Sequence, residues 1–279
     1  MILRLLILCL ALILPACVSS TQPKLFEVPT GREKANIPFW WIPHEAAQAT
    51  LVLFTGGAGN LGPNNNDALN GPPSWERSGF LVRNWERFHK EGFNIAIVGR
   101  AQDRVQAQDG STASPVVYRA SAEHSREIRE VLQNIKQLAS EKDIWLVGHS
   151  MGTVAVENAT IANPDIVVGE VLLSSITHLG GVKSPRGTIP ASGLKFEEIR
   201  VPTLMLSHSQ DMCPGSQPEH AKDNFSALSN APRKELVFLS GGRPSVDNPC
   251  DSRHYHGFFG IEGEVVKRTA SWIRASSGE

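Results

Sequence analysis

Short apolar runs recur along the chain, and stretches with helical periodicity separate them. Six of these runs are rich in Val, Ile and Leu without polar alternation, which is typical of parallel strands covered on both faces. They span residues 50–54, 95–98, 144–147, 168–173, 203–206 and 236–239. Two earlier segments, residues 25–28 and 38–42, predict antiparallel strands at one edge, and the Phe39-Trp40-Trp41 cluster predicts core packing.

Apolar residues at three- and four-residue steps predict helices between these runs. The steps occur at Ile128, Val131, Leu132, Ile135 and Leu138, at Leu81, Trp85 and Phe88, and at Val266, Ala270 and Ile273. Strands that alternate with helices in this way predict an α/β fold: a doubly wound, mostly parallel sheet of about eight strands with helices on both faces. Reactive groups in such sheets gather at the carboxyl ends of the strands.

One strand end carries a catalytic motif. The run 144–147 leads into Gly148-His149-Ser150-Met151-Gly152, and a helix-compatible stretch, residues 153–162, follows at once. This G-x-S-x-G pattern is typical of a nucleophile elbow, in which the serine occupies a strained turn and the glycines allow close backbone approach. The pattern alone is weak, but its strand-to-helix context is specific. We therefore expect Ser150 to be a nucleophile and His149 to be a packing residue.

With this motif the chain resembles the α/β-hydrolase family over about residues 48–275. The resemblance implies a catalytic triad in the chain order serine, acid, histidine. Asp211 follows the run 203–206, where the family often places its acid. His256 lies between the last strand and the final helix and is the expected imidazole, with His254 as the alternative. The other histidines, among them His44, His89 and His124, are expected at the surface.

The resemblance to this family implies a chemical role for each of these residues. Ser150 is a poor nucleophile until the neutral imidazole of His256 takes its proton, and Asp211 would fix the tautomer of that ring. The oxyanion hole is expected from the backbone N–H of Met151 and that of Gly57, with Ala58 as the alternative to Gly57. The loop 55–59 could also cradle a phosphate, but no G-K-[ST] follows it.

Composition narrows the possible partners. The 279 residues are 41% hydrophobic and carry 27 basic against 28 acidic side chains, a net charge of −1. This fits one α/β domain over residues 26–279 and gives no basic surface for nucleic acid. The sequence contains no metal-ligating constellation and no nucleotide fingerprint, so no metal or cofactor is expected. The expected partner is a small-molecule acyl substrate.

The N-terminus predicts export. Arg4 precedes the apolar stretch 5–14, which ends in Leu14-Pro15-Ala16-Cys17 and resembles the lipobox of bacterial lipoproteins. The resemblance implies that residues 1–16 are a signal peptide, that Cys17 is lipidated, and that residues 17–25 tether the domain to a membrane of the bacterial cell envelope, facing the periplasm or the exterior. The alternative is a plain signal peptide cleaved nearby.

Cysteine usage agrees with export. Cys9 lies in the removed segment and Cys17 is the lipid site, which leaves Cys213 and Cys250. In an oxidising envelope two remaining thiols predict a disulfide, and two free buried thiols are the alternative. A bridge between these positions would tie the loop of Asp211 to the loop of His256.

Two functions are consistent with these features. The first is an esterase-like serine hydrolase that forms an acyl-enzyme, with the short insertion at residues 175–200 arguing against a large lid. The second is a non-catalytic envelope lipoprotein that uses the same fold as a binding module. The retention of serine, acid, histidine and glycine-rich loop in the right order favours the enzyme.

Overall fold

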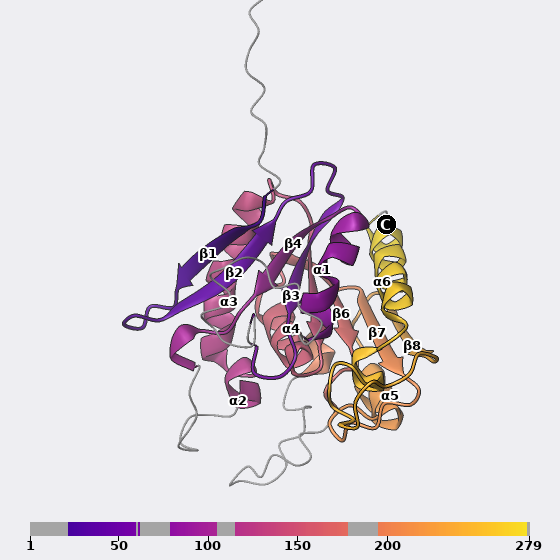
Figure 1. The fold of residues 1–279 in the computed structure, drawn as a ribbon. Helices are drawn as coiled ribbons and strands as arrows, with labels where there is room; N and C mark the ends of the chain where they lie inside the picture. The colour runs from indigo at the N-terminus through magenta and orange to yellow at the C-terminus, as the bar shows by residue number, and fades with distance from the viewer. Residues whose placement is uncertain (1–21, 60, 62–78, 105–114, 178–194, 278–279) are drawn as a thin grey trace, which may run out of the picture.

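An eight-stranded sheet organises the part of the chain that the structure describes (Figure 1). The computed structural model describes residues 22–59, 61, 79–104, 115–177 and 195–277. The spatial order of the strands is β1-β2-β4-β3-β5-β6-β7-β8. Their bounds are β1 Lys24–Pro29, β2 Asn36–Ile42, β3 Ala49–Phe54, β4 Phe93–Val98, β5 Ile144–His149, β6 Val167–Leu173, β7 Thr203–His208 and β8 Lys234–Leu239.

The sheet is mostly parallel, as predicted. Strand β1 pairs antiparallel with β2, and β2 pairs antiparallel with β4, whereas β4, β3, β5, β6, β7 and β8 are mutually parallel neighbours. All residues of β3, β4 and β5 are buried, in agreement with strands covered on both faces. The expectation of full coverage is wrong for β8, because it is an edge strand and leaves Phe238 38% exposed.

Six α-helices of the described residues connect and cover the strands. They are α1 Phe80–Lys90, α2 Pro115–Arg119, α3 Ala122–Leu138, α4 Met151–Ala162, α5 Pro218–Ala227 and α6 Glu262–Ser276. The periodic stretches of the sequence correspond to α1, α3 and α6, and the stretch after the elbow corresponds to α4. The apolar periodicity did not reveal α5, because only Ala221 and Asn224 of that helix are buried.

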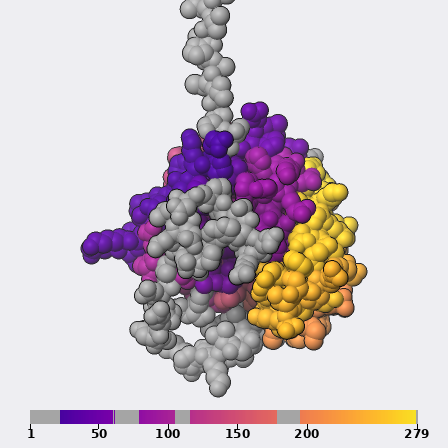
Figure 2. Space-filling model, in the orientation of Figure 1, coloured from indigo at the N-terminus to yellow at the C-terminus, as the bar shows by residue number. Residues whose placement is uncertain are grey.

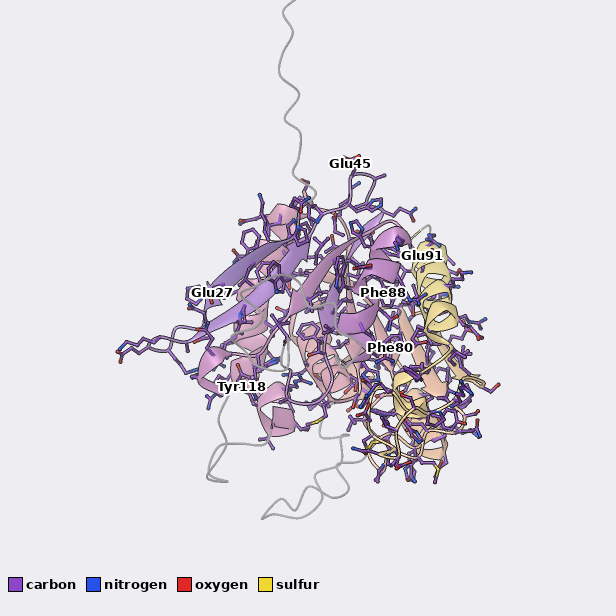
Figure 3. All side chains as sticks on the ribbon, viewed as in Figure 1. Glu27, Glu45, Phe80, Phe88, Glu91 and Tyr118 are labelled. Carbon is purple, nitrogen blue, oxygen red and sulfur yellow. A yellow bond between two sulfur atoms is a disulfide. The ribbon has the colours of Figure 1, made fainter. Side chains whose placement is uncertain are left out.

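Two apolar cores lie on opposite faces of the sheet. Helices α1 and α6 pack on one face, and α3 and α4 pack on the other (Figure 1). Phe80 and Phe88 of α1 are fully buried against the first face (Figure 3). The neighbours Trp40 and Trp41 of β2 enter different cores, each 5% exposed, because side chains alternate along a strand. The prediction that they pack in the core is confirmed.

The structure leaves the N-terminal predictions untested. The signal peptide, Cys17 and the first part of the tether lie outside the described residues, as do most of residues 60–78 and of the insertion 175–200. Within the described ranges, no helix has the length and apolarity that a membrane crossing requires.

Two carboxylates are fully buried where α4 covers β6. Glu157 of α4 accepts a hydrogen bond from Ser175 Oγ at 3.3 Å, and Glu170 of β6 accepts one from Thr203 Oγ1 at 3.2 Å. Burial raises the pKa of Glu170 to about 7. Burial, and then the charge of Glu170, raise the pKa of Glu157 well above its ordinary value. The core therefore favours protonated acids at these positions.

This burial predicts a pH dependence of stability. The unfolded chain releases the Glu170 proton near pH 4.5, but the folded protein keeps it to about pH 7. Stability therefore falls as the pH rises through this window. The substitution Glu170→Gln removes the titrating group. Between pH 5 and pH 8, the free energy of unfolding of this variant should therefore rise relative to that of the wild type by on the order of 2 to 3 kcal/mol. Urea unfolding at both pH values measures this difference.

The control for this prediction is Glu45→Gln, because Glu45 is exposed at the molecular surface (Figure 3). That variant should follow the wild-type pH profile. Parallel profiles for Glu170→Gln and wild type would show that the buried acid is ionised in the folded protein, contrary to the expectation.

Candidate active site

Ser150 occupies the sharp turn between β5 and α4. Its backbone has φ 53° and ψ −127°, a region that a residue with a Cβ adopts only under strain. Surrounding hydrogen bonds hold this geometry: Ser150 N–H donates to Leu173 O at 2.9 Å, and Thr153 donates to Ser150 O through its N–H at 2.9 Å and its Oγ1 at 2.8 Å. The side chain is half-buried at the carboxyl edge of the sheet. This is the conformation that the elbow motif predicts.

The two motif glycines are required by close backbone contacts. A Cβ on Gly148 would lie 2.7 Å from Thr153 Cα, and a Cβ on Gly152 would collide with the carbonyl oxygen of Phe54 at the end of β3. These neighbours are backbone atoms in buried elements, so they cannot move aside easily. The spacing of the motif thus follows from the packing of α4 against β3 and β5.

This packing predicts the outcome of adding one methyl group. Gly152→Ala should destabilise the protein by about 3 kcal/mol, because the new Cβ overlaps a fixed backbone atom. The matched control is Gly79→Ala, since a Cβ at Gly79 would meet no atom within 4 Å and the backbone there has negative φ. The control should change stability by less than about 1 kcal/mol. Thermal unfolding of both variants tests the contrast, and equal unfolding temperatures would contradict it.

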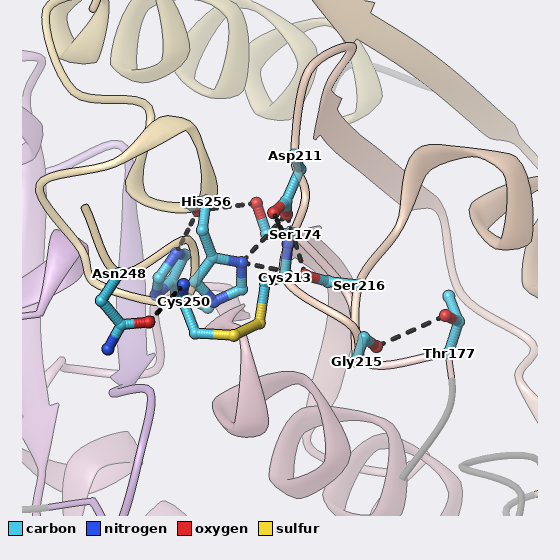
Figure 4. The surroundings of a disulfide bond; sticks show 10 residues. Ser174, Thr177, Asp211, Cys213, Gly215, Ser216, Asn248, Cys250 and His256 are labelled. Carbon is cyan, nitrogen blue, oxygen red and sulfur yellow. Dashed lines mark hydrogen bonds and ion pairs between the residues drawn. A yellow bond between two sulfur atoms is a disulfide. The ribbon is translucent and has the colours of Figure 1, made fainter. Parts of the chain in front are cut away.

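Asp211 and His256 form a buried hydrogen-bonded pair (Figure 4). His256 Nδ1 lies 2.9 Å from Asp211 Oδ2, and the two residues are 2% and 3% exposed. Asp211 Oδ1 accepts the N–H of Cys213 at 2.9 Å. Because a carboxylate only accepts hydrogen bonds, Nδ1 must carry the proton, which leaves Nε2 free to accept one. The structure brings His256 to Asp211, whereas His254 makes no such bond within the described residues.

The backbone of His256 is attached to the elbow. Its carbonyl oxygen accepts hydrogen bonds from Ser174 Oγ at 2.8 Å and from His149 Nε2 at 2.9 Å, and the rings of His149 and His256 have centroids 5.1 Å apart. Burial lowers the pKa of His149 well below its ordinary value, so this ring is a neutral donor. His149 is a packing residue as predicted, and it also positions the histidine loop. The described residues show no hydrogen bond between Ser150 Oγ and His256.

The glycine-rich loop approaches Ser150 from the other side. A Cβ on Gly56 would lie 3.2 Å from Ser150 Cβ, so the backbone of this loop borders Ser150 directly. Gly57 has φ +56°, and a Cβ there would meet no atom within 4 Å. Met151, the second expected donor, is the first residue of α4, where backbone N–H groups have no partner within the helix. Both N–H groups thus belong to segments that flank the Ser150 hydroxyl.

A buried arginine, Arg119, stabilises this loop through a hydrogen bond. Arg119 Nη2 donates to Thr55 O at 2.9 Å, and its guanidinium lies against Gly59, where any Cβ would collide with it. Burial, and then the charge of Arg100, lower the pKa of Arg119 to about 10. His124, next to Tyr118, is likewise buried, with a pKa lowered to about 3 by burial. The expectation of a surface position is wrong for His124, because its helix face is covered by α2.

Sequence reasoning missed two residues, one of which contacts the pair while the other supports the loop that carries His256. Ser216 Oγ lies 2.8 Å from Asp211 Oδ2 and 2.9 Å from His256 Nδ1. Arg83 Nη2 donates to Gly257 O at 2.6 Å, so α1 supports the histidine loop. No local motif marks either residue, since their partners lie in segments that only the fold brings near. Within the described ranges, no cluster of three or more His, Cys, Asp or Glu side chains is arranged to hold a metal ion.

The predicted disulfide joins the two loops of the pair. Cys213 and Cys250 are bonded across 37 residues, with Cα atoms 4.7 Å apart (Figure 4). Cys213 is buried and Cys250 is exposed, so a reductant can reach the bond from one side. Figure 2 shows the chain after β7 and the C-terminal segment in contact on the same side of the molecule. The bridge therefore fixes loops that must stay together for Asp211 to bond His256.

Removing this bridge should weaken both stability and the pair. The double variant Cys213→Ala/Cys250→Ala should lose about 3 to 4 kcal/mol of stability, from the chain entropy that a 37-residue loop restricts. Any catalytic activity that depends on this pair should fall as well, because the Asp211 loop is freed. A reductant should lower the unfolding temperature of the wild type. It should leave that of the double variant unchanged, which shows that the reductant acts only through the disulfide. Undiminished activity without the bridge would contradict its role in holding the pair.

Comparison with known proteins establishes the fold. No family model matches the chain, and no curated protein matches it in sequence. Solved structures do match: Est1E from Butyrivibrio proteoclasticus superposes with a TM-score of 0.61 at 13% identity, over 91% of this chain and 99% of that one. Dienelactone hydrolase from Anabaena variabilis gives 0.56 at 12% identity, over 91% and 99%.

A third match is XC6422 from Xanthomonas campestris, an α/β serine hydrolase without lid, with a TM-score of 0.52 at 14% identity, over 89% of this chain and 95% of that one. The similarity extends over nearly the whole length of each chain. This protein has the α/β-hydrolase fold.

Proposed function

We propose that the protein is an esterase-like serine hydrolase that uses Ser150, His256 and Asp211. The observation that carries this proposal is the buried hydrogen bond between His256 Nδ1 and Asp211 Oδ2 beside a strained serine turn. A core does not need an imidazole and a carboxylate at this position, because burying a charge is costly. General-base catalysis does need them, since the carboxylate orients the ring and stabilises its cation.

The mechanism follows from the proton positions. As Ser150 Oγ attacks the acyl carbon, its proton passes to His256 Nε2, and the imidazolium is stabilised by Asp211. The N–H groups of Gly57 and Met151 would stabilise the oxyanion, each contributing about 2.7 to 4 kcal/mol. His256 then gives the proton to the leaving alcohol, and an acyl-Ser150 ester remains. Water, activated by the same ring, attacks this ester and releases the acid.

The choice of an ester as substrate rests on similarity. Est1E was solved with ferulic acid bound, and a further match is a cold-adapted esterase from an Arctic intertidal metagenomic library. A small acyl substrate also fits the balanced charge of the chain, which provides no field to attract a polyanion. These points favour carboxylic esters for this protein.

The proposed location is the bacterial cell envelope. The lipobox-like segment supports lipidation of Cys17, and the Cys213–Cys250 bridge supports an oxidising compartment. The domain would then act at a membrane surface, facing the periplasm or the exterior. Radiolabelled palmitate incorporation in wild type and in Cys17→Ala tests this part separately from catalysis.

A fluorophosphonate probe tests the catalytic proposal. It should label the wild type, and labelling should vanish in Ser150→Ala. Hydrolysis of p-nitrophenyl esters should fall at least 1,000-fold in that variant and about 10,000-fold in Asp211→Asn. The matched control, Ser226→Ala on the exposed face of α5, should retain full labelling and turnover. Absent labelling of correctly folded wild type would favour the non-catalytic binding module instead. Esters of graded chain length would then define the acyl preference.

A further inference from the structure

Ser216 lies at the centre of the Asp211–His256 contact. Its side chain is fully buried, and Figure 4 shows its hydroxyl directed at both partners. The three atoms Ser216 Oγ, Asp211 Oδ2 and His256 Nδ1 are separated by 2.8, 2.9 and 2.9 Å. They form a nearly equilateral triangle in which every pair lies within hydrogen-bond distance.

The protons available in this triangle restrict its arrangement. The carboxylate accepts only, the hydroxyl has one proton, and Nδ1 either donates or accepts. The ionised carboxylate is the strongest acceptor, so the Ser216 hydroxyl donates its hydrogen bond to Asp211 Oδ2. The Ser216 oxygen then presents only lone pairs to Nδ1. An unprotonated Nδ1 would face no hydrogen-bond donor there. The neutral ring is therefore kept in the tautomer that carries its proton on Nδ1, and Nε2 can accept a proton.

The backbone around Ser216 is firmly held. Ser216 N–H donates to Cys213 O at 3.0 Å, and Gly215 O accepts the N–H of Thr177 at 2.8 Å, beyond the end of β6. Cys213 is also bonded to Cys250. The backbone that carries this hydroxyl therefore cannot move away from the pair without breaking contacts to two other segments.

We propose that Ser216 is a positioning residue that fixes the carboxylate of Asp211 and the tautomer of His256. This inference rests on the proposed serine hydrolase function. Ser216 provides a second hydrogen-bonded route between ring and carboxylate beside the direct one. Its loss therefore weakens catalysis without abolishing it, unlike the loss of Ser150.

Steady-state kinetics on a p-nitrophenyl ester test this role. Ser216→Ala should lower kcat about tenfold and leave KM within about twofold, because the residue acts on the imidazole rather than on the bound ester. Ser216→Thr, which keeps the hydroxyl, should recover most of the loss, and Ser226→Ala is the control on the neighbouring helix. Unchanged kcat in Ser216→Ala would overturn the proposal. So would a loss of kcat that follows the fraction of unfolded protein and that Ser216→Thr does not rescue.

A second measurement is independent of turnover. In the Ser150→Ala background, the His256 Nδ1 proton should give a downfield-shifted NMR resonance, and adding Ser216→Ala should move it or broaden it through faster exchange. An identical resonance in both proteins would overturn the proposal even if kcat falls. If the wild type fails to react with fluorophosphonate, the hydrolase proposal fails, and this resonance still decides whether Ser216 positions the ring.

Discussion

The hydrogen bond between Asp211 and His256 is the contact on which the site depends. Its partners are 45 residues apart in sequence, and both are removed from water. A carboxylate in such a place is tolerated only when its oxygens are satisfied, and here Cys213 N–H, Ser216 Oγ and the imidazole all point at it. The cost of leaving any of these groups unpaired opposes separation of the two loops. The disulfide adds a covalent constraint to the same juxtaposition.

The sheet order explains why this contact lies beside Ser150. Strands β5, β6, β7 and β8 are consecutive parallel neighbours, so their carboxyl ends lie in a row along one edge. Ser150 follows β5, Asp211 follows β7, and the loop with His256 follows β8. Ser174, which follows β6, donates a hydrogen bond to the carbonyl of His256 and so connects the end of β6 to the loop after β8. The position of each of these three residues is thus a consequence of strand order.

Much of this arrangement can be predicted from the sequence, because its signals are local. Buried parallel strands read as unbroken apolar runs, and the elbow requires glycines at fixed spacing for contacts that the structure now specifies at Phe54 and Thr153. The Cys213–Cys250 pairing followed from elimination among four cysteines. The strand ends were placed within a few residues of their observed positions.

The residues that escaped prediction act through contacts distant in sequence. Nothing in the sequence distinguishes Ser216 from the other serines, because only the fold brings its hydroxyl to Asp211. Arg83 donates to the carbonyl of Gly257, which is 174 residues away in sequence. His124 was expected at the surface, but α2 covers its face of α3 and leaves it buried. Helix α5 lacks an apolar stripe, and the local signal for it is Pro218, a residue type favoured in the first turn of a helix.

A crystal structure of the protein after reaction with a fluorophosphonate tests the central claim most directly. The account predicts phosphorus bonded to Ser150 Oγ, His256 Nε2 within about 2.7 to 3.2 Å of an adduct oxygen, and the phosphoryl oxygen between the N–H groups of Gly57 and Met151. An adduct on another side chain, or an intact Ser150 adduct with the His256 ring turned away from it, would contradict the convergence of the three residues.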